Sequence, residues 1–180
     1  QQGKLKEANS VNLTCLEYVR SFHDDYDKLH AFQSMLKELH KQDEDKVIER
    51  VFSDMLTIIR NPRSKQDKSG WLLQILIQLA QGGRIDEALE LCQEITGEYE
   101  KVVSAVHIAK WMLRTDQYTR QETLIQDAIW SARKLSGNKK IIALRLIAIE
   151  LYNQGQTKEG NTLISECLEL VDELSTATSR

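Results

Sequence analysis

Apolar residues recur along the first third of the chain at three- and four-residue steps, the spacing of one face of an α-helix. Residues 13–22, 29–39 and 47–59 each follow this pattern. The acidic residues at positions 24–27 mark either a break between two helices or the solvated face of one. Asp43 is suited to cap the helix over 47–59, because its carboxylate can accept hydrogen bonds from free N–H groups at the helix start. This part of the sequence therefore predicts helices.

A polar stretch at residues 61–68 contains the only proline of the chain, Pro62. Proline disfavours the helical conformation of the residue before it, so a helix is expected to end here. We therefore predict an N-terminal helical segment over 1–60, a linker over 61–68 and a second helical region over 69–180. A single continuous domain over 1–180 is the alternative.

After residue 69, helices that are apolar on most sides alternate with amphipathic ones. Residues 71–80, 102–114 and 141–152 are almost uniformly apolar, which predicts helices sandwiched between neighbours. Each is followed by a turn and then by a helix with one inward-facing stripe. These stripes are Ile85, Ala88, Leu89, Cys92 and Ile95; Leu124, Ile125, Ala128, Ile129, Ala132 and Leu135; and Leu163, Ile164, Cys167, Leu168 and Val171.

The three turns can be aligned. The segment QGGRIDEAL at 81–89 matches NQGQTKEGN at 153–161, with Gly83 over Gly155, and the middle copy has Asp116 at this position. The first spacing, 33 residues, is that of a helix-turn-helix repeat of about 34 residues, and the second, 39 residues, implies a longer helix.

Capping signals mark the helix after the middle turn. Thr119 and Glu122 match a capping box at its start, and Gly137 suits its C-terminal end. We expect this helix to span the residues between these signals.

This turn pattern resembles the tetratricopeptide-repeat family over residues 69–175. The resemblance implies an all-α fold of about eight or nine helices, with antiparallel helix hairpins stacked as an α-solenoid. Family members are typically interaction scaffolds, so it also implies binding of a peptide segment of another protein in a groove formed by the first helix of each hairpin. The matching residues are Gly83, Ile85, Asp86, Glu87 and Ala88, then Tyr118, Gly155, Glu159 and Gly160.

In register, the resemblance implies that seven side chains face this groove: Gln74, Gln81, His107, Lys110, Arg114, Arg145 and Asn153.

Positive charge is concentrated near the centre of the repeat region. Residues 101–145 carry nine Lys or Arg and three Asp or Glu, whereas residues 146–180 carry two and six. The spacing of His107, Lys110 and Arg114 places them on one helix face. These cations could receive an acidic peptide segment or a chain carboxylate of the partner.

Arg145 is the only cation among the apolar residues 141–149. We expect it to be buried, and a buried guanidinium needs a partner because an unpaired buried charge is costly. The alternative to a ligand is that neighbouring repeats neutralise one another and that Arg145 pairs with a glutamate of this domain.

We expect no enzymatic activity, cofactor or metal. The sequence contains no phosphate-binding glycine loop, nucleophile elbow or Cys-x-x-Cys pair. His23, His30 and His40 lie near several acids, but no metal-ligand spacing supports a site, so we predict solvated positions. Bound metal after purification would revive a hydrolase interpretation.

The three cysteines and three tryptophans are predicted mainly to fill the core. The odd number of cysteines favours free thiols in a reducing compartment. Trp111 is expected at the groove edge, and Trp130 falls beside the apolar stripe of its helix and could form an interface. These residues are Cys15, Cys92, Cys167, Trp71, Trp111 and Trp130.

Overall composition excludes several classes of function. The net charge is −3, so we expect no general nucleic-acid binder. We see no signal peptide or membrane-spanning stretch and expect a soluble, cytoplasmic protein. Because the chain begins at Gln1, we expect a piece of a longer polypeptide or a processed form. A self-associating structural domain, using Trp130 or residues 168–174, is the alternative to peptide binding.

Overall fold

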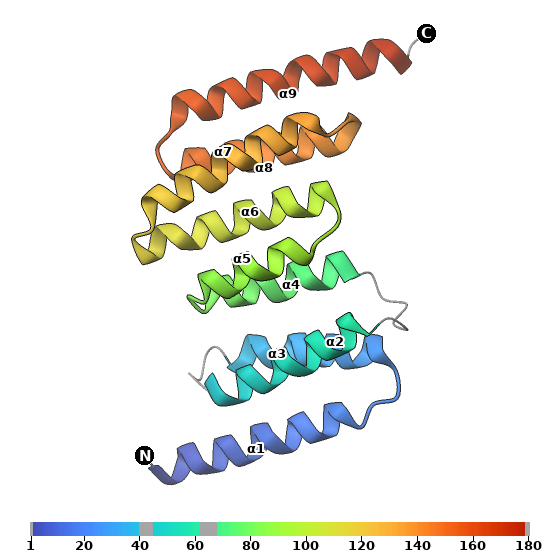
Figure 1. Ribbon diagram of the computed structural model, residues 1–180, viewed down its shortest axis with the longest axis vertical. Coiled ribbons are helices and arrows are strands. Elements are labelled where there is room, and N and C mark those ends of the chain that lie inside the picture. Colours follow the sequence, from blue (N-terminus) through green and yellow to red (C-terminus); the bar gives the residue numbers. More distant parts are fainter. Residues whose placement is uncertain (1, 40–44, 62–67, 179–180) are drawn as a thin grey trace. The chain divides into compact units, whose positions relative to one another are not determined.

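The computed structural model is all-helical over the residues it describes, 2–39, 45–61 and 68–178 (Figure 1). These residues form nine α-helices and one short 3-10 helix and no strand, which confirms the all-α class. The helices are α1 (Gln2–Arg20), α2 (Asp25–Leu39), α3 (Asp45–Arg60), α4 (Lys68–Gln81), α5 (Ile85–Glu94), α6 (Glu98–Met112), η1 (Leu113–Thr115), α7 (Tyr118–Lys134), α8 (Gly137–Asn153) and α9 (Thr157–Thr178).

The chain divides into two compact units, Gln1–Trp71 and Leu72–Arg180. The predicted linker begins at Asn61, the last described residue after α3, and the unit boundary falls a few residues beyond it, within α4. Each unit contains its own buried apolar side chains, and each is described separately below.

In the first unit, α1 packs against both α2 and α3. The acidic stretch proves to be a helix break, because Asp24 caps α2: its Oδ1 accepts hydrogen bonds from the N–H groups of Tyr26 and Asp27 at 2.8 and 3.1 Å. Asp43, the predicted cap of α3, lies outside the described residues. The fully buried side chains of this unit include Leu16, Leu29, Phe32, Leu36, Leu39, Met55 and Ile59.

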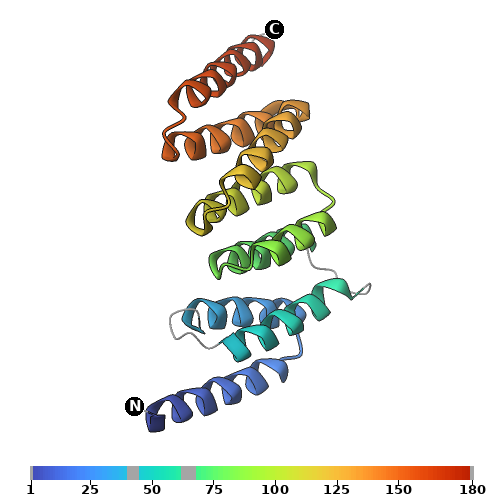
Figure 2. The same ribbon diagram turned by 60° about the vertical axis from the view of Figure 1, so that its left-hand side comes forward.

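In the second unit, α6 packs against α7 and α8, and α8 packs against α9 (Figures 1 and 2). The core between them contains many small residues, which allow the helix backbones to approach closely. Its buried members include Val102, Ala105, Ala109, Ile125, Ala128, Ala132, Ala143, Leu144, Ile147, Ala148, Leu151 and Leu163.

The three aligned turns of this unit share one backbone conformation. Gly83, Asp116 and Gly155 all have positive φ angles, 78°, 55° and 76°. In each turn the next residue donates its N–H to a carbonyl five residues earlier, as in the Schellman motif that ends many helices. These bonds join Arg84 to Leu79 (2.9 Å), Gln117 to Met112 (3.1 Å) and Gln156 to Leu151 (2.9 Å).

The predicted caps of α7 were wrong. The residue that precedes its first turn is Gln117, which makes no side-chain cap bond, and Thr119 lies inside the helix. The α7 helix ends at Lys134, and Gly137 is the first residue of α8 instead of the end of α7. The Schellman bond of Gln117 fixes where α7 begins, so the backbone of the turn overrides the capping-box residues.

Candidate functional site

The first candidate surface is the solvent-exposed side of α8. Although α8 packs against α6, α7 and α9, it leaves Ile142, Ile149 and Tyr152 exposed, at 42%, 47% and 38% of their accessible area. Arg145 lies between them in sequence and is also exposed. The prediction that Arg145 is buried was therefore wrong, because the apolar run includes side chains that face water as well as side chains that face the core.

The neighbouring helix α6 and the 3-10 helix after it add two more exposed cations. Lys110 is exposed near the end of α6, and Arg114 lies in η1, where its guanidinium stacks over the Trp111 ring at 4.2 Å. Within the described part of the chain, no carboxylate lies within salt-bridge distance of Lys110, Arg114 or Arg145. We call this set of exposed residues on α6, η1 and α8 the cationic face.

His107 lies one helical turn before Lys110 on α6 and is half-buried. Burial lowers the pKa of its imidazole, the charge of Lys110 lowers it further, and the carboxylate of Glu150 acts in the opposite direction. His107 of α6 and Glu150 of α8 are therefore near neighbours, which agrees with the packing of these two helices.

The buried carboxylate of Glu150 belongs to a chain of side-chain hydrogen bonds. The Nε2 of Gln154 donates to Glu150 Oε1 at 3.0 Å, and the Nε2 of Gln121 donates to Gln154 Oε1 at 2.8 Å. Gln121 is buried at the position that Ala88 and Gly160 occupy in the other two copies. The sequence analysis did not predict this network. Gln121 could have indicated it, because a large polar residue stands there at a position where the other two copies have a small one.

The other three predicted residues lie on α4 and at the end of α8. Gln81 and Asn153 are exposed at the ends of α4 and α8, and Gln74 is half-buried within α4. The structure therefore brings His107 of α6 close to Glu150 of α8, it places Arg145 near Cys167 of α9, and the two glutamines lie on α4.

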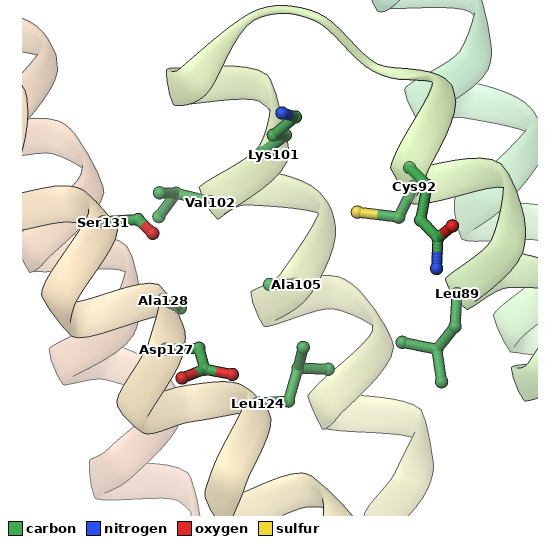
Figure 3. Close-up of a pocket in the computed structure, with 10 residues that line it drawn as sticks. Leu89, Cys92, Lys101, Val102, Ala105, Leu124, Asp127, Ala128 and Ser131 are labelled. Atoms are coloured by element: carbon green, nitrogen blue, oxygen red, sulfur yellow. The ribbon is translucent and has the colours of Figure 1, made fainter.

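The second candidate surface is a groove between α5 and α7 with α6 as its floor, and Figure 3 shows its lining. Its volume is about 560 Å³. Leu89 and Cys92 point into it from α5 (Figure 3), while Val102 and Ala105 of α6 and Ala128 of α7 are buried apolar residues of its lining. We call it the α5–α7 groove.

A smaller pocket of about 290 Å³ extends the α5–α7 groove along the same two helices, because both are lined by Leu89, Leu124 and Asp127. Arg120 also lines this extension and forms an ion pair with Asp86 of α5 at 2.8 Å. The groove therefore runs between two helices that an ion pair links near one end.

None of the seven predicted site residues lines the α5–α7 groove or its extension. Leu89, Leu124 and Cys92 were predicted to face the core, but all three are half-buried groove residues. The sequence does not show that one side of these apolar stripes has no covering helix.

The three thiols are free and differ in exposure. Cys15 is exposed on α1, so its predicted role in the core was wrong. Burial raises the pKa of the Cys92 thiol, and burial, together with the charge of Glu166, raises that of Cys167. Cys167 is buried, and its Sγ donates to the carbonyl of Ile141 at 3.6 Å.

The two described histidines of the first unit are surface residues. His23 and His30 are exposed, and His40 lies outside the described residues. His30 contacts the ring of Trp71, with 5.0 Å between ring centroids. Within the described ranges, no group of three or more His, Cys, Asp and Glu side chains is placed to hold a metal ion.

The tryptophans occupy three environments. Trp71 is buried, as predicted, and Trp111 is half-buried beneath Arg114. Trp130 is 64% exposed on α7, and the ammonium of Lys134 lies over its ring. The position of Trp130 beside the apolar stripe is therefore confirmed.

Among the helices of the described residues, none is both long and apolar enough to cross a lipid bilayer.

Comparisons with known proteins give little information. No protein-family model matches the chain, and no curated protein matches it in sequence. Among solved structures, the chain is similar to the crystal structure of Ton1535 from Thermococcus onnurineus NA1, with a TM-score of 0.47 and 15% sequence identity. The match covers 98% of this chain and 55% of that one, so this chain spans about half of its length. Similarity at this level assigns neither a family nor a function.

Proposed function

We propose that this protein is a non-catalytic interaction module that binds a peptide segment of another protein on the cationic face. We further propose that its helix hairpins stack as a tetratricopeptide-like α-solenoid. The three equivalent turns support the stacking, as do side-chain bonds between residues 33 or 34 positions apart: Arg20–Asp54, Asp86–Arg120, Gln121–Gln154 and Arg133–Glu166.

The observation that carries the binding proposal is the exposed side of α8. A helix packed by three neighbours usually buries its large apolar residues, but Ile142, Ile149 and Tyr152 remain in water around Arg145. Covering these side chains with a partner would remove apolar area from water, which is the main source of affinity in such interfaces.

The charges of the face indicate which partner fits. Lys110, Arg114 and Arg145 have no carboxylate partner among the described residues, so acidic side chains could pair with them without displacing an internal contact. Exposed pairs contribute about 0–1 kcal/mol each, so they direct orientation and specificity more than affinity. We therefore propose a segment that combines apolar and acidic residues.

The test uses fluorescein-labelled peptides in which Leu and Phe are interspersed with Asp and Glu, together with counterparts in which every acid is Lys. Fluorescence anisotropy would follow binding to the native chain and to the Lys110→Glu/Arg145→Glu variant. The matched control, Lys46→Glu/Lys158→Glu, makes the same charge change at exposed residues outside the face.

We expect the native chain and the control to bind the acidic peptides and the variant to bind about tenfold more weakly, since two attractions become repulsions. Circular dichroism would establish equal helicity. Equal binding by all three proteins, or a preference for the lysine peptides, would refute the proposal.

Self-association is the second candidate, favoured by an exposed apolar row on α9. Leu168, Val171 and Leu174 are exposed at three-residue steps, and Trp130 is exposed on α7. Sedimentation velocity over a wide concentration range would decide. A mass that rises with concentration in the native chain, but not in Leu168→Glu/Val171→Glu, would favour an assembly domain.

A further inference from the structure

The exposed apolar side chains of α8 and α9 lie on one side of this helix pair, whose two members are neighbours (Figures 1 and 2). The hydroxyl of Tyr152 on α8 donates to Oδ1 of Asn161 on α9 at 2.7 Å. Helical spacing places Leu168 and Val171 on the same side of α9 as Asn161. It likewise places Arg145 on the same side of α8 as Tyr152. The exposed sets of the two helices therefore meet.

A second interaction agrees with this alignment. Burial and the charge of Glu166 raise the pKa of the Cys167 thiol, whereas the charge of Arg145 lowers it. Arg145 therefore lies near Cys167, the residue before Leu168. The exposed residues form one continuous region, which we call the α8–α9 surface: Ile142, Arg145, Ile149 and Tyr152 of α8, with Leu168 and Val171 of α9.

The preceding hairpin buries the corresponding positions. The turns at Asp116 and Gly155 have the same backbone conformation and lie 39 residues apart, so α8 and α9 correspond to α6 and α7. Three positions that are exposed on the α8–α9 surface are buried in that hairpin: Arg145, Leu168 and Val171 correspond to Val106, Ile129 and Ala132.

Helix α8 is the element that covers these positions of the α6–α7 hairpin. It packs against both α6 and α7, and Val106, Ile129 and Ala132 belong to one buried cluster with it. Its own members of the cluster combine small and branched residues: Ala143, Leu144, Ile147, Ala148 and Leu151. In the described part of the chain, no helix lies over α8 and α9 in this way. The covering helix of one hairpin therefore shows what fits the next.

The charges of the α8–α9 surface differ between its two helices. On α8, Arg145 stands where α6 has Val106. On α9, Asp172 follows Val171 and Glu169 follows Leu168, and both acids are exposed. Among the described residues, neither acid has a Lys, Arg or His within salt-bridge distance. A helix lying between α8 and α9 would meet a base on one side and acids on the other.

We propose that the α8–α9 surface binds one amphipathic helix of a partner protein, in the way that α8 lies on the α6–α7 hairpin. The bound helix presents small and branched apolar residues to the surface. It carries Asp or Glu on the flank toward Arg145 and Lys or Arg on the flank toward Asp172. This docking mode rests on the proposed function, because the same segment meets Arg145 and the apolar side chains of α8. It adds the conformation of the segment and the contribution of α9.

The test uses the full 180-residue chain and a fluorescein-labelled peptide of about four helical turns, the helix peptide. The helix peptide repeats the apolar pattern of α8 along one face, with Glu on one flank and Lys on the other. A second peptide has the same composition with the apolar residues dispersed around the helix. A third has proline at two solvent-facing positions, which breaks the helix and keeps the other residues. Fluorescence anisotropy gives the dissociation constants.

Two protein variants change α9 outside the cationic face, and each has a matched control. Leu168→Glu places a charge on the apolar surface, and Val11→Glu makes a similar change on α1, at a residue that is 60% exposed, close to the 62% of Leu168. Asp172→Lys reverses a flanking charge, and Glu159→Lys makes the same change at an exposed residue of α9 that is not part of the surface. Circular dichroism would establish equal helicity.

We expect the native chain and both controls to bind the helix peptide with equal affinity. Leu168→Glu should weaken binding about tenfold, because the bound helix would bury the new charge, and Asp172→Lys about fivefold, because it repels the lysine flank. The dispersed peptide and the proline peptide should bind the native chain at least about tenfold more weakly than the helix peptide.

The docking mode is overturned if the proline peptide binds as tightly as the helix peptide, or if Leu168→Glu behaves like Val11→Glu. If the acidic peptides nevertheless lose affinity for Lys110→Glu/Arg145→Glu, the cationic face stands and only the docking mode is wrong. If the native chain binds neither set of peptides, both proposals fail. A native chain that dimerises in sedimentation velocity, when Leu168→Glu stays monomeric, also overturns the docking mode, since a second copy then covers the surface.

Discussion

At the scale of single residues, the three turns of the second unit use different amino acids for the same left-handed backbone. Gly83 and Gly155 adopt positive φ freely because they have no Cβ atom, whereas Asp116 does so as an L-residue. A Cβ added at Gly83 or Gly155 would meet no atom within 4 Å, so only the backbone restricts these positions.

We predict that Gly83→Ala and Gly155→Ala each lower the free energy of unfolding by about 1 kcal/mol, the usual cost of positive φ for a residue with a Cβ. Asp116→Gly should change the free energy of unfolding by less than about 0.5 kcal/mol. Glycine removes the backbone strain of positive φ, but its greater conformational entropy in the unfolded chain offsets this gain. Urea denaturation would measure these differences.

Gly82→Ala is the control for this prediction. The N–H of Gly82 still bonds to Gln78 four residues back, at 3.0 Å, so Gly82 continues the helical pattern and should tolerate alanine. A similar loss in Gly82→Ala and Gly83→Ala would contradict the explanation from φ.

His107 makes stability depend on pH. Its pKa is lowered from the ordinary value of 6.5, first by burial and then by Lys110. Well above pH 6.5 the imidazole is neutral in both the folded and the unfolded state. As the pH falls through 6.5, the unfolded state binds a proton before the folded state does. The free energy of unfolding therefore decreases.

We therefore predict that the native chain loses stability relative to His107→Gln when the pH falls from one unit above to one unit below 6.5. Urea denaturation of both proteins at the two pH values would measure the difference. A gap that stays constant or changes in the opposite direction would show that the imidazole is not shifted downward.

At the scale of helices, α7 is joined to its neighbours by two kinds of contact. Its ion pair with α5, Arg120–Asp86, is exposed to solvent on both sides. The hydrogen-bond chain from Gln121 through Gln154 to Glu150 ends on two buried side chains. When an exposed ion pair is broken, both groups are hydrated by water, so little free energy is lost. When a buried hydrogen-bond chain is broken, polar groups are left without partners. The hydrogen-bond chain should therefore contribute more to the free energy of unfolding than the ion pair.

We predict that Gln154→Ala lowers the free energy of unfolding by about 1–3 kcal/mol, because it leaves the amide of Gln121 and the carboxylate of Glu150 without this partner. Asp86→Ala should cost less than about 1 kcal/mol. Asn153→Ala, at the exposed neighbour of Gln154, is the control and should have little effect. An equal cost for Gln154→Ala and Asp86→Ala in urea denaturation would refute this ranking.

At the scale of the molecule, both candidate surfaces belong to the second unit. Among the described residues, no carboxylate lies within salt-bridge distance of Lys110, Arg114 or Arg145, whereas the charged residues that line the α5–α7 groove and its extension are Asp127, Lys101 and Arg120. The sequence showed an excess of positive charge over residues 101–145 but not which of these charges face solvent without a partner, since that depends on how the helices pack.

The sequence predicted the helices and their turns well. The spacing of apolar residues is a local property, so residues 71–80, 102–114 and 141–152 correspond closely to α4, α6 and α8. The alignment of Gly83, Asp116 and Gly155 likewise corresponds to one shared backbone conformation.

The candidate surfaces were predicted less well, because exposure depends on which neighbours a helix has. Arg145 was expected in the core because of its apolar flanks, and Leu89 and Leu124 because of their stripes, yet all three meet solvent to some degree.

The bonds between residues 33 or 34 positions apart also bear on how the chain folds. Closing a loop of that length costs an entropy that grows only with the logarithm of its size, and each of the four bonds requires the same modest closure. Most other contacts lie within helices or between helices adjacent along the chain, and such local contacts favour rapid folding. In a stack of repeats, as proposed for this chain, folding can begin at any hairpin and spread to the next, and a change that disrupts one hairpin should slow the steps beside it more than distant ones.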